Sequence, residues 1–245
     1  MSRTVVVAAL ACLVPSLALA APAPGPVTLA REVVHVKGDG GDVTLEYPVV
    51  TAAPGTKALD ALNQALSLDN ALKESLSGLE AQAKEGSVTG LTYTVGYNGH
   101  GVLDLTFDLA TMGAYPDVQV THVLLDTRSG KVIHAADCFD AGKLEQLATA
   151  VDTDFRAAID KLFAESGADL DGIADGLRDM HFGPTNLDSF EVTAQGVVFT
   201  FDFDFPHVAL ALEPDGRFPM SWAEIAPFLK ADAPIAAVAP ERPVR

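Results

Sequence analysis

The chain has 245 residues, of which 49% are hydrophobic and 20% are charged, so it can build one large core or two small ones. Its 33 acidic and 16 basic residues give a formal net charge of −17 at pH 7, which disfavours nucleic acid as a partner and favours cationic ones. Two cysteines are too few for a disulfide framework or a cysteine-rich metal site. We therefore expect an acidic globular protein without a cofactor or a bound metal.

Residues 1–20 have the pattern of a secretory signal peptide. A positive charge at Arg3 precedes an apolar run that contains Pro15 and is too short to cross a bilayer, and the run ends in small residues that fit a cleavage site after Ala20. A lipoprotein anchored through Cys12 is the alternative, although the apolar stretch before this cysteine is short. We expect a periplasmic or secreted protein with no stable membrane insertion after cleavage.

Alternating apolar and polar residues dominate the next part of the chain. They predict two strands, over residues 27–36 and 42–50, joined by a glycine-rich turn. Leucines at spacings of three and four then predict an amphipathic helix over residues 59–79, broken near Asp69. A hairpin and a helix therefore open the folded part.

A second hairpin is predicted over residues 88–97 and 101–110, with Asn98-Gly99 as its turn. Successive side chains of a strand point to opposite faces, so the second strand has one apolar and one polar face. Leu103, Leu105, Phe107 and Leu109 form the expected core face, and Asp104, Thr106 and Asp108 form the expected solvent face.

The following segment combines a strand with a second long helix. Residues 118–125 predict the strand, and Asp140 is expected to cap a helix whose buried stripe runs from Leu144 to Leu162. Cys138, the only cysteine left after cleavage, has apolar neighbours and no adjacent histidine or basic residue. We expect this thiol to be buried and unreactive.

Strands resume at residues 189–193 and 197–205, and the second has phenylalanines at every other position. Ser221 is expected to cap a final helix that runs to Lys230. The remaining residues, 231–245, are rich in Ala, Pro and Val and predict a loosely held tail.

Hairpins separated by two longer helices indicate an α+β fold, with an antiparallel sheet and both helices packed on it. Four segments follow from these patterns: a signal peptide over residues 1–20, a Pro/Ala spacer over 21–30, the folded domain over 31–230 and a disordered tail over 231–245.

The most notable polar cluster lies at the end of the phenylalanine-rich strand. The two-residue period places Asp202 and Asp204 on one face, with His207 just beyond. A metal or general-base site would need further ligands, which Asp104 and Asp108 would supply only from a neighbouring strand. A solvent-facing acidic surface and a binding face for a cationic partner are the other interpretations.

The remaining residues do not predict a catalytic site. His122 is in register with Val118 and Val120, which indicates a partly buried, hydrogen-bonded histidine and not a metal ligand. No nucleophile elbow, zinc-binding helix or phosphate-binding glycine loop is present. We therefore assign no catalytic residue and no metal ligand, although a triad scattered along the sequence would escape this search.

The order of several short motifs resembles the RsiV-like extracytoplasmic domain, a domain of unknown function shared by the lysozyme-sensing anti-sigma factor RsiV and some peptidoglycan deacetylases. The resemblance covers about residues 45–229. The motifs that carry it are Leu45-Glu46-Tyr47-Pro48, Met112-Gly113-Ala114-Tyr115-Pro116, Gly130-Lys131-Val132-Ile133, Cys138-Phe139, Gly196-Val197-Val198-Phe199-Thr200-Phe201 with Pro206, and Phe218-Pro219-Met220-Ser221-Trp222.

This resemblance implies an α+β sensor module that binds a ligand. It implies ligand contacts at Tyr115 and Pro116, where the family often has a histidine in place of Tyr115, and at His207, where the family often has an aromatic residue. We expect no cytoplasmic sigma-binding segment, membrane-spanning helix or deacetylase domain in this chain.

Three functional hypotheses follow. The first is an exported, non-catalytic binding module that recognises a cell-wall component or a cationic protein such as lysozyme, with Tyr115, Pro116, Asp202, Asp204 and His207 as binding residues. The second is a hydrolase of cell-wall material that uses Asp202, Asp204 and His207. The third is a structural envelope protein with no soluble ligand.

Overall fold

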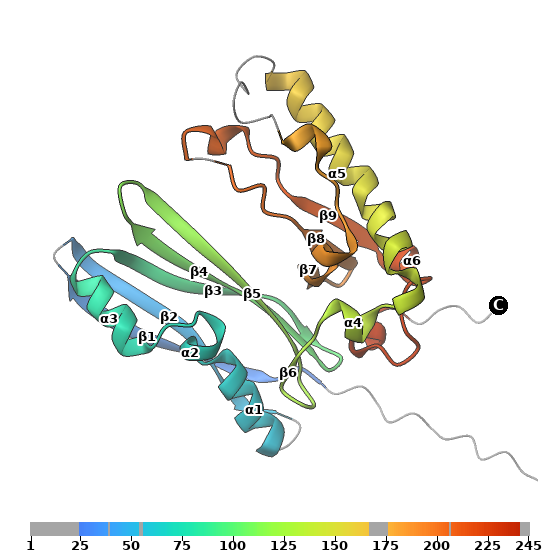
Figure 1. Cartoon of the computed structure of the whole chain (residues 1–245). Coiled ribbons are helices and arrows are strands. Elements are labelled where there is room, and N and C mark those ends of the chain that lie inside the picture. The colour runs from blue at the N-terminus through green and yellow to red at the C-terminus, as the bar shows by residue number, and fades with distance from the viewer. Residues whose placement is uncertain (1–24, 39, 54–55, 167–175, 206, 241–245) are drawn as a thin grey trace, which may run out of the picture.

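The computed structural model describes residues 25–38, 40–53, 56–166, 176–205 and 207–240, so the predicted signal peptide lies outside the described residues. The described chain forms two units, a six-stranded sheet with three short helices and a C-terminal unit with a three-stranded sheet and a long helix (Figure 1). The predicted α+β class is confirmed. No helix in these ranges is both long and apolar enough to cross a membrane.

The six-stranded sheet follows the order of the sequence, so each strand pairs with the next. All neighbours are antiparallel except β2 and β3, which are parallel and pair at Leu45 and Leu91. The strands are β1 (Thr28–Gly38), β2 (Gly41–Ala52), β3 (Val88–Gly99), β4 (Val102–Met112), β5 (Pro116–Asp126) and β6 (Lys131–Val132). Both predicted hairpins are present.

Three short helices connect β2 to β3 and pack on one face of this sheet (Figure 1). They are α1 (Thr56–Leu66), α2 (Leu68–Ala71) and α3 (Leu76–Lys84), so the single predicted helix is divided into three. The Ser75 side chain caps α3 by accepting a hydrogen bond from the Gly78 amide. Their leucines pack with the apolar side chains of β2 to β5 into the first core.

The β3–β4 turn lies two residues beyond the predicted one. His100 and Gly101 have φ values of 51° and 87° and form the turn, because Gly99 already pairs with Val102. The Asn98 side chain instead accepts from the Val27 amide and donates to the Val27 carbonyl, each at 2.9 Å. Asn98 therefore fixes the start of β1, which lies within one residue of the start of the predicted strand.

The C-terminal unit begins after β6 with α4 (Ala135–Cys138) and the long helix α5 (Leu144–Ser166). Its sheet is antiparallel, in the order β7 (Phe190–Val192), β8 (Gly196–Thr200), β9 (Arg217–Ser221). Short helical segments complete it: η1 (Ala141–Lys143), η3 (Leu177–Asp179), η4 (Pro184–Asp188), η5 (His207–Leu212), α6 (Trp222–Ile225) and η6 (Pro234–Ala237). The second predicted long helix is therefore α5, and it packs on the smaller sheet.

Phenylalanines form the centre of the C-terminal core. Phe155 of α5 stacks on Phe203 with ring centroids 5.3 Å apart and makes an edge contact with Phe201 at 4.9 Å. The β8 strand ends at Thr200, five residues before the predicted end. Beyond this end the residues no longer pair with a strand, but buried and exposed side chains still alternate. Phe203 and Phe205 are buried, and Asp202 and Asp204 are exposed.

The segment expected to be a loosely held tail is partly built into this core. Ile235 is fully buried, Ala233 and Val238 are nearly so, and all three belong to the same apolar cluster as Phe155. The short helix η6 lies here, and α4 contacts it. The expectation of a loosely held tail came from the composition of the segment alone. Composition does not indicate that its apolar side chains pack beside α4.

Candidate binding cleft

A cleft lies between the outer half of the β4–β5 hairpin and the C-terminal unit. It has an inner part of about 930 Å³ and an outer part of about 670 Å³. Val120 and Asp202 line both parts, so the two are continuous. One wall is β5, and the opposite wall is built by residues between Thr185 and Arg217.

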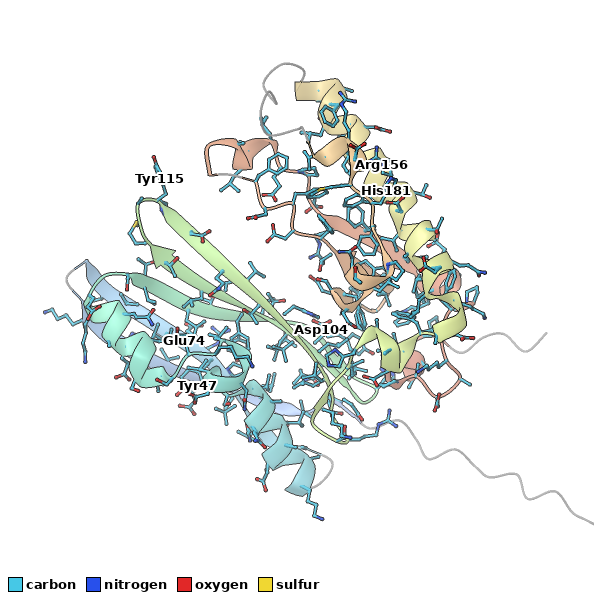
Figure 2. All side chains as sticks on the ribbon, viewed as in Figure 1. Tyr47, Glu74, Asp104, Tyr115, Arg156 and His181 are labelled. Atoms are coloured by element: carbon cyan, nitrogen blue, oxygen red, sulfur yellow. The ribbon has the colours of Figure 1, made fainter. Side chains whose placement is uncertain are left out.

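Asp104 joins the two units where they meet (Figure 2). Its Oδ2 accepts a 2.6 Å hydrogen bond from the Val192 amide of β7, and its Oδ1 lies 2.9 Å from Nε2 of His122 on β5. Only 1% of Asp104 is exposed, so the expectation that it faces solvent is wrong. The C-terminal unit covers this end of β4 and buries the carboxylate there, whereas Asp108, further along the strand, stays half-buried.

His122 lines the inner part of the cleft with 24% of its side chain exposed. It is a half-buried histidine with a hydrogen-bond partner, as its register with the β5 valines predicted. The sequence did not identify Asp104 as that partner. The two residues are diagonal neighbours in the β4–β5 ladder, because His122 lies opposite Thr106 and Asp104 lies opposite Leu124, and only the pairing of the strands reveals this.

A second ion pair lies on the opposite wall. Arg217 of β9 donates two hydrogen bonds to Glu191 of β7, at 2.7 and 2.6 Å, in a bidentate arrangement across the small sheet. This contact with Glu191 is the main reason that the pKa of Arg217 is raised. The guanidinium is thereby held along the wall by Glu191.

Of the predicted binding residues, Asp202 and Asp204 line the cleft, whereas Tyr115 and Pro116 lie next to its lining in sequence but are not part of it. Tyr115 is 59% exposed at the tip of the β4–β5 hairpin, and Pro116 begins β5 beside it (Figure 2). Asp202 and Asp204 line the outer part of the cleft on the facing wall. The backbone of His207 begins η5, but its side chain lies outside the part of the structure that is described.

The two aspartates form a tight turn. Asp202 Oδ1 accepts a 2.8 Å hydrogen bond from the Asp204 amide, and Asp204 has a φ of 53°. Among the described residues, no group of three or more histidine, cysteine or acidic side chains is placed to hold a metal ion. Within these described residues, Asp104 and Asp108 therefore do not join Asp202 and Asp204 as the further ligands that a metal site would need.

The described lining of the cleft is strongly acidic. It contains seven carboxylates, whereas its one lysine or arginine is Arg217, which binds Glu191. The acidic residues are Asp117, Asp188, Glu191, Asp202, Asp204, Glu213 and Asp215. A cation entering the cleft would meet carboxylates from both walls, so the arrangement favours a positively charged ligand.

The β5 wall also presents apolar side chains. Val118 is 53% exposed and Val120 is 63% exposed, an unusual state for large aliphatic residues. The sequence did not identify this surface, because the alternation of β5 predicts an inward-facing side for both valines. The C-terminal unit covers only the far end of that side, at Leu124.

Cys138 lies away from the cleft in the C-terminal core. Its side chain is fully buried and is a free thiol. Burial, with a smaller contribution from Asp137, raises its pKa to about 12. At neutral pH the sulfur is therefore protonated and a poor nucleophile.

Comparisons with known proteins show similarity in fold alone. No family model and no curated protein matches the chain. Among solved structures, a DUF3298 family protein from Pseudomonas aeruginosa is similar with a TM-score of 0.58 and 16% identity, over 89% of this chain and 98% of that one. A member of the same family from Bacteroides fragilis has a TM-score of 0.54 and 16% identity, over 88% and 98%. The chain therefore has the fold of DUF3298 proteins.

Proposed function

We propose that the chain is an exported, non-catalytic binding module of the RsiV-like type, which holds a cationic protein of the cell wall, such as a muramidase, in the cleft. The observation that carries the proposal is the cleft itself, with carboxylates on both walls and exposed valines on one. Such a surface accelerates encounter with a basic protein and supplies apolar area for contact.

The local structure of the two predicted aspartates also supports binding over catalysis. The Asp202 carboxylate accepts the Asp204 amide, so one of its oxygens is already used to hold the turn. Both side chains are exposed to solvent at the wall of the cleft. An exposed acidic pair of this kind is accessible to a cationic ligand.

Binding of purified lysozyme to the immobilised protein tests the proposal. We expect saturable binding that weakens with salt but persists at physiological ionic strength. The double variant Asp202→Lys plus Asp204→Lys should bind at least about tenfold more weakly, because it places like charges opposite a basic partner.

A matched control carries the same change in charge elsewhere. Asp60 of α1 and Asp69 of α2 are exposed on the helices, which cover the other face of the six-stranded sheet. The variant Asp60→Lys plus Asp69→Lys should bind lysozyme nearly as well as the unaltered protein. Equal loss in both variants would mean that net charge alone acts, and the cleft would not be the site.

Export has its own test. If residues 1–20 form a cleaved signal peptide, the protein recovered from the periplasm or the medium should have a mass that corresponds to a chain starting at Ala21. Recovery of the whole chain from the cytoplasm, still starting at Met1, would overturn this part of the proposal.

A further inference from the structure

The outer half of β5 has no strand on the side away from β4. In the described chain, β6 pairs with β5 only at Leu125 and Asp126, and one further hydrogen bond joins the Ile133 amide to the Leu124 carbonyl. From Pro116 to His122, β5 is therefore an edge strand. Such an edge offers backbone donors and acceptors to any extended chain that approaches it.

The direction of these backbone groups follows from the Leu124 carbonyl. It points away from β4 toward Ile133, and backbone groups in a strand alternate between the two sides. The N–H and C=O groups of Val118, Val120 and His122 consequently point to the open side. The Val118 amide illustrates this, because it donates to Oδ1 of its neighbour Asp117 at 2.9 Å and not to a strand.

The open edge lies inside the cleft. A cleft that touched only one face of β5 would be lined by every second residue. Instead, the consecutive residues 117–120 line the outer part and 120–122 line the inner part. The cleft therefore runs along the edge of β5, with the exposed side chains of Val118 and Val120 beside it.

We propose that the cleft binds an extended segment of a cationic protein, which adds as a strand to the free edge of β5 between Val118 and His122. This inference rests on the proposed function, because it specifies how the same cleft would hold its partner. Backbone hydrogen bonds would come from Val120 and His122, and Val118 and Val120 would contact the side chains that the segment directs to the same side of the sheet.

Charge identifies the chemistry of the added strand. Asp117 flanks the start of the edge, and Asp202, Asp204 and Glu213 face it from the other wall. Val118, Val120 and the facing carboxylates lie on the same side of the sheet, so lysine or arginine at every second position of an added strand would reach the carboxylates and lay the aliphatic parts of these side chains against the valines. Neutral or acidic strands would lack the first contact.

A pair of synthetic peptides separates strand addition from attraction by charge. The first is an eight-residue peptide of alternating lysine and valine with blocked ends, and the second is the same peptide with its four central backbone nitrogens methylated. Both have the same charge and side chains, but the second lacks the donors for strand pairing. We expect it to bind at least about tenfold more weakly, the effect of losing two hydrogen bonds.

Amide hydrogen exchange locates the added strand. When the unmethylated peptide is bound at saturation, exchange at the Val120 and His122 amides should slow. The amides of Gln119 and Thr121 are internal controls, because they point toward β4 and are protected with or without the peptide. Unchanged exchange at Val120 and His122, or equal affinity for both peptides, would overturn strand addition.

A protein variant tests the same edge. Val120→Pro removes an outward N–H, and proline is tolerated on the open side of an edge strand. It should weaken binding of the unmethylated peptide at least about tenfold, whereas Val120→Thr, which keeps the amide and changes only the side-chain contact, should weaken it by no more than about threefold. Lysozyme binding without any peptide pairing would overturn this inference and leave the proposed function standing. Strand pairing with the peptide but no binding of lysozyme would overturn the proposed function and leave the free edge of β5 as a site for cationic strands.

Discussion

Replacing Asp104 by alanine should loosen the junction between the two units. The substitution leaves the Val192 amide buried without an acceptor, which costs about 1–3 kcal/mol. It also removes the hydrogen bond to His122, but this side chain is 24% exposed and water can replace most of that contact, so we add about 1 kcal/mol. The expected loss in the free energy of unfolding is about 2–4 kcal/mol.

Urea unfolding with two probes measures this loss. Trp222 is the only tryptophan, is buried in the C-terminal unit and donates to the Ala194 carbonyl, so its fluorescence reports on that unit. Circular dichroism reports on both units. In Asp104→Ala we expect the fluorescence transition to move to lower urea and to precede the transition seen by circular dichroism.

Two further variants make the test specific. Asp104→Asn keeps one oxygen that can accept the Val192 amide, so its loss should be smaller than that of Asp104→Ala. Asp108→Ala removes a half-buried acid from the same face of β4 and should cost no more than about 0.5 kcal/mol. A shift below about 0.5 kcal/mol for Asp104→Ala would refute the role of the carboxylate as the link between the units.

Three other substitutions or reactions test the core. Cys138 should not react with a thiol reagent at pH 8 in the native state, because burial raises its pKa to about 12. It should react after denaturation. Labelling of the native protein at the rate of an exposed thiol would contradict its burial. Gly196→Ala should destabilise by about 3 kcal/mol or more, since a Cβ there would lie 1.9 Å from the Met220 carbonyl oxygen, and thermal melting measures this. Ile235→Ala should cost about 2–4 kcal/mol in urea unfolding, whereas Ala237→Ser on the exposed side of η6 should be nearly neutral; equal stability would show that the tail is not part of the core.

The sequence predicted the parts of the fold that depend on local periodicity. The two hairpins, the long helix α5 and the inward phenylalanines all follow from side-chain spacing. The β3–β4 turn was placed wrongly because Asn98-Gly99 is a favoured turn pair. The side-chain amide of Asn98 instead binds the backbone of Val27, 71 residues away in sequence. A tertiary contact of this kind leaves no local pattern.

The candidate site was predicted less completely for the same reason. The association of Asp202 with Asp204 was predicted because the two residues lie two positions apart in the sequence, although they form a turn and not the predicted strand face. Asp104 was misplaced because alternation assigns a residue to a face of its sheet but does not say which other unit covers that face. The free edge of β5 depends on how short β6 is, and two paired residues are too few to predict from sequence.

The burial of η6 separates the two cores along the chain. Strands β1 to β6 pair in chain order, so the first core needs only residues up to about 132. The second core is complete only when Ile235, about 100 residues further along, is in place. The C-terminal unit can therefore close onto a partner sheet that is already formed.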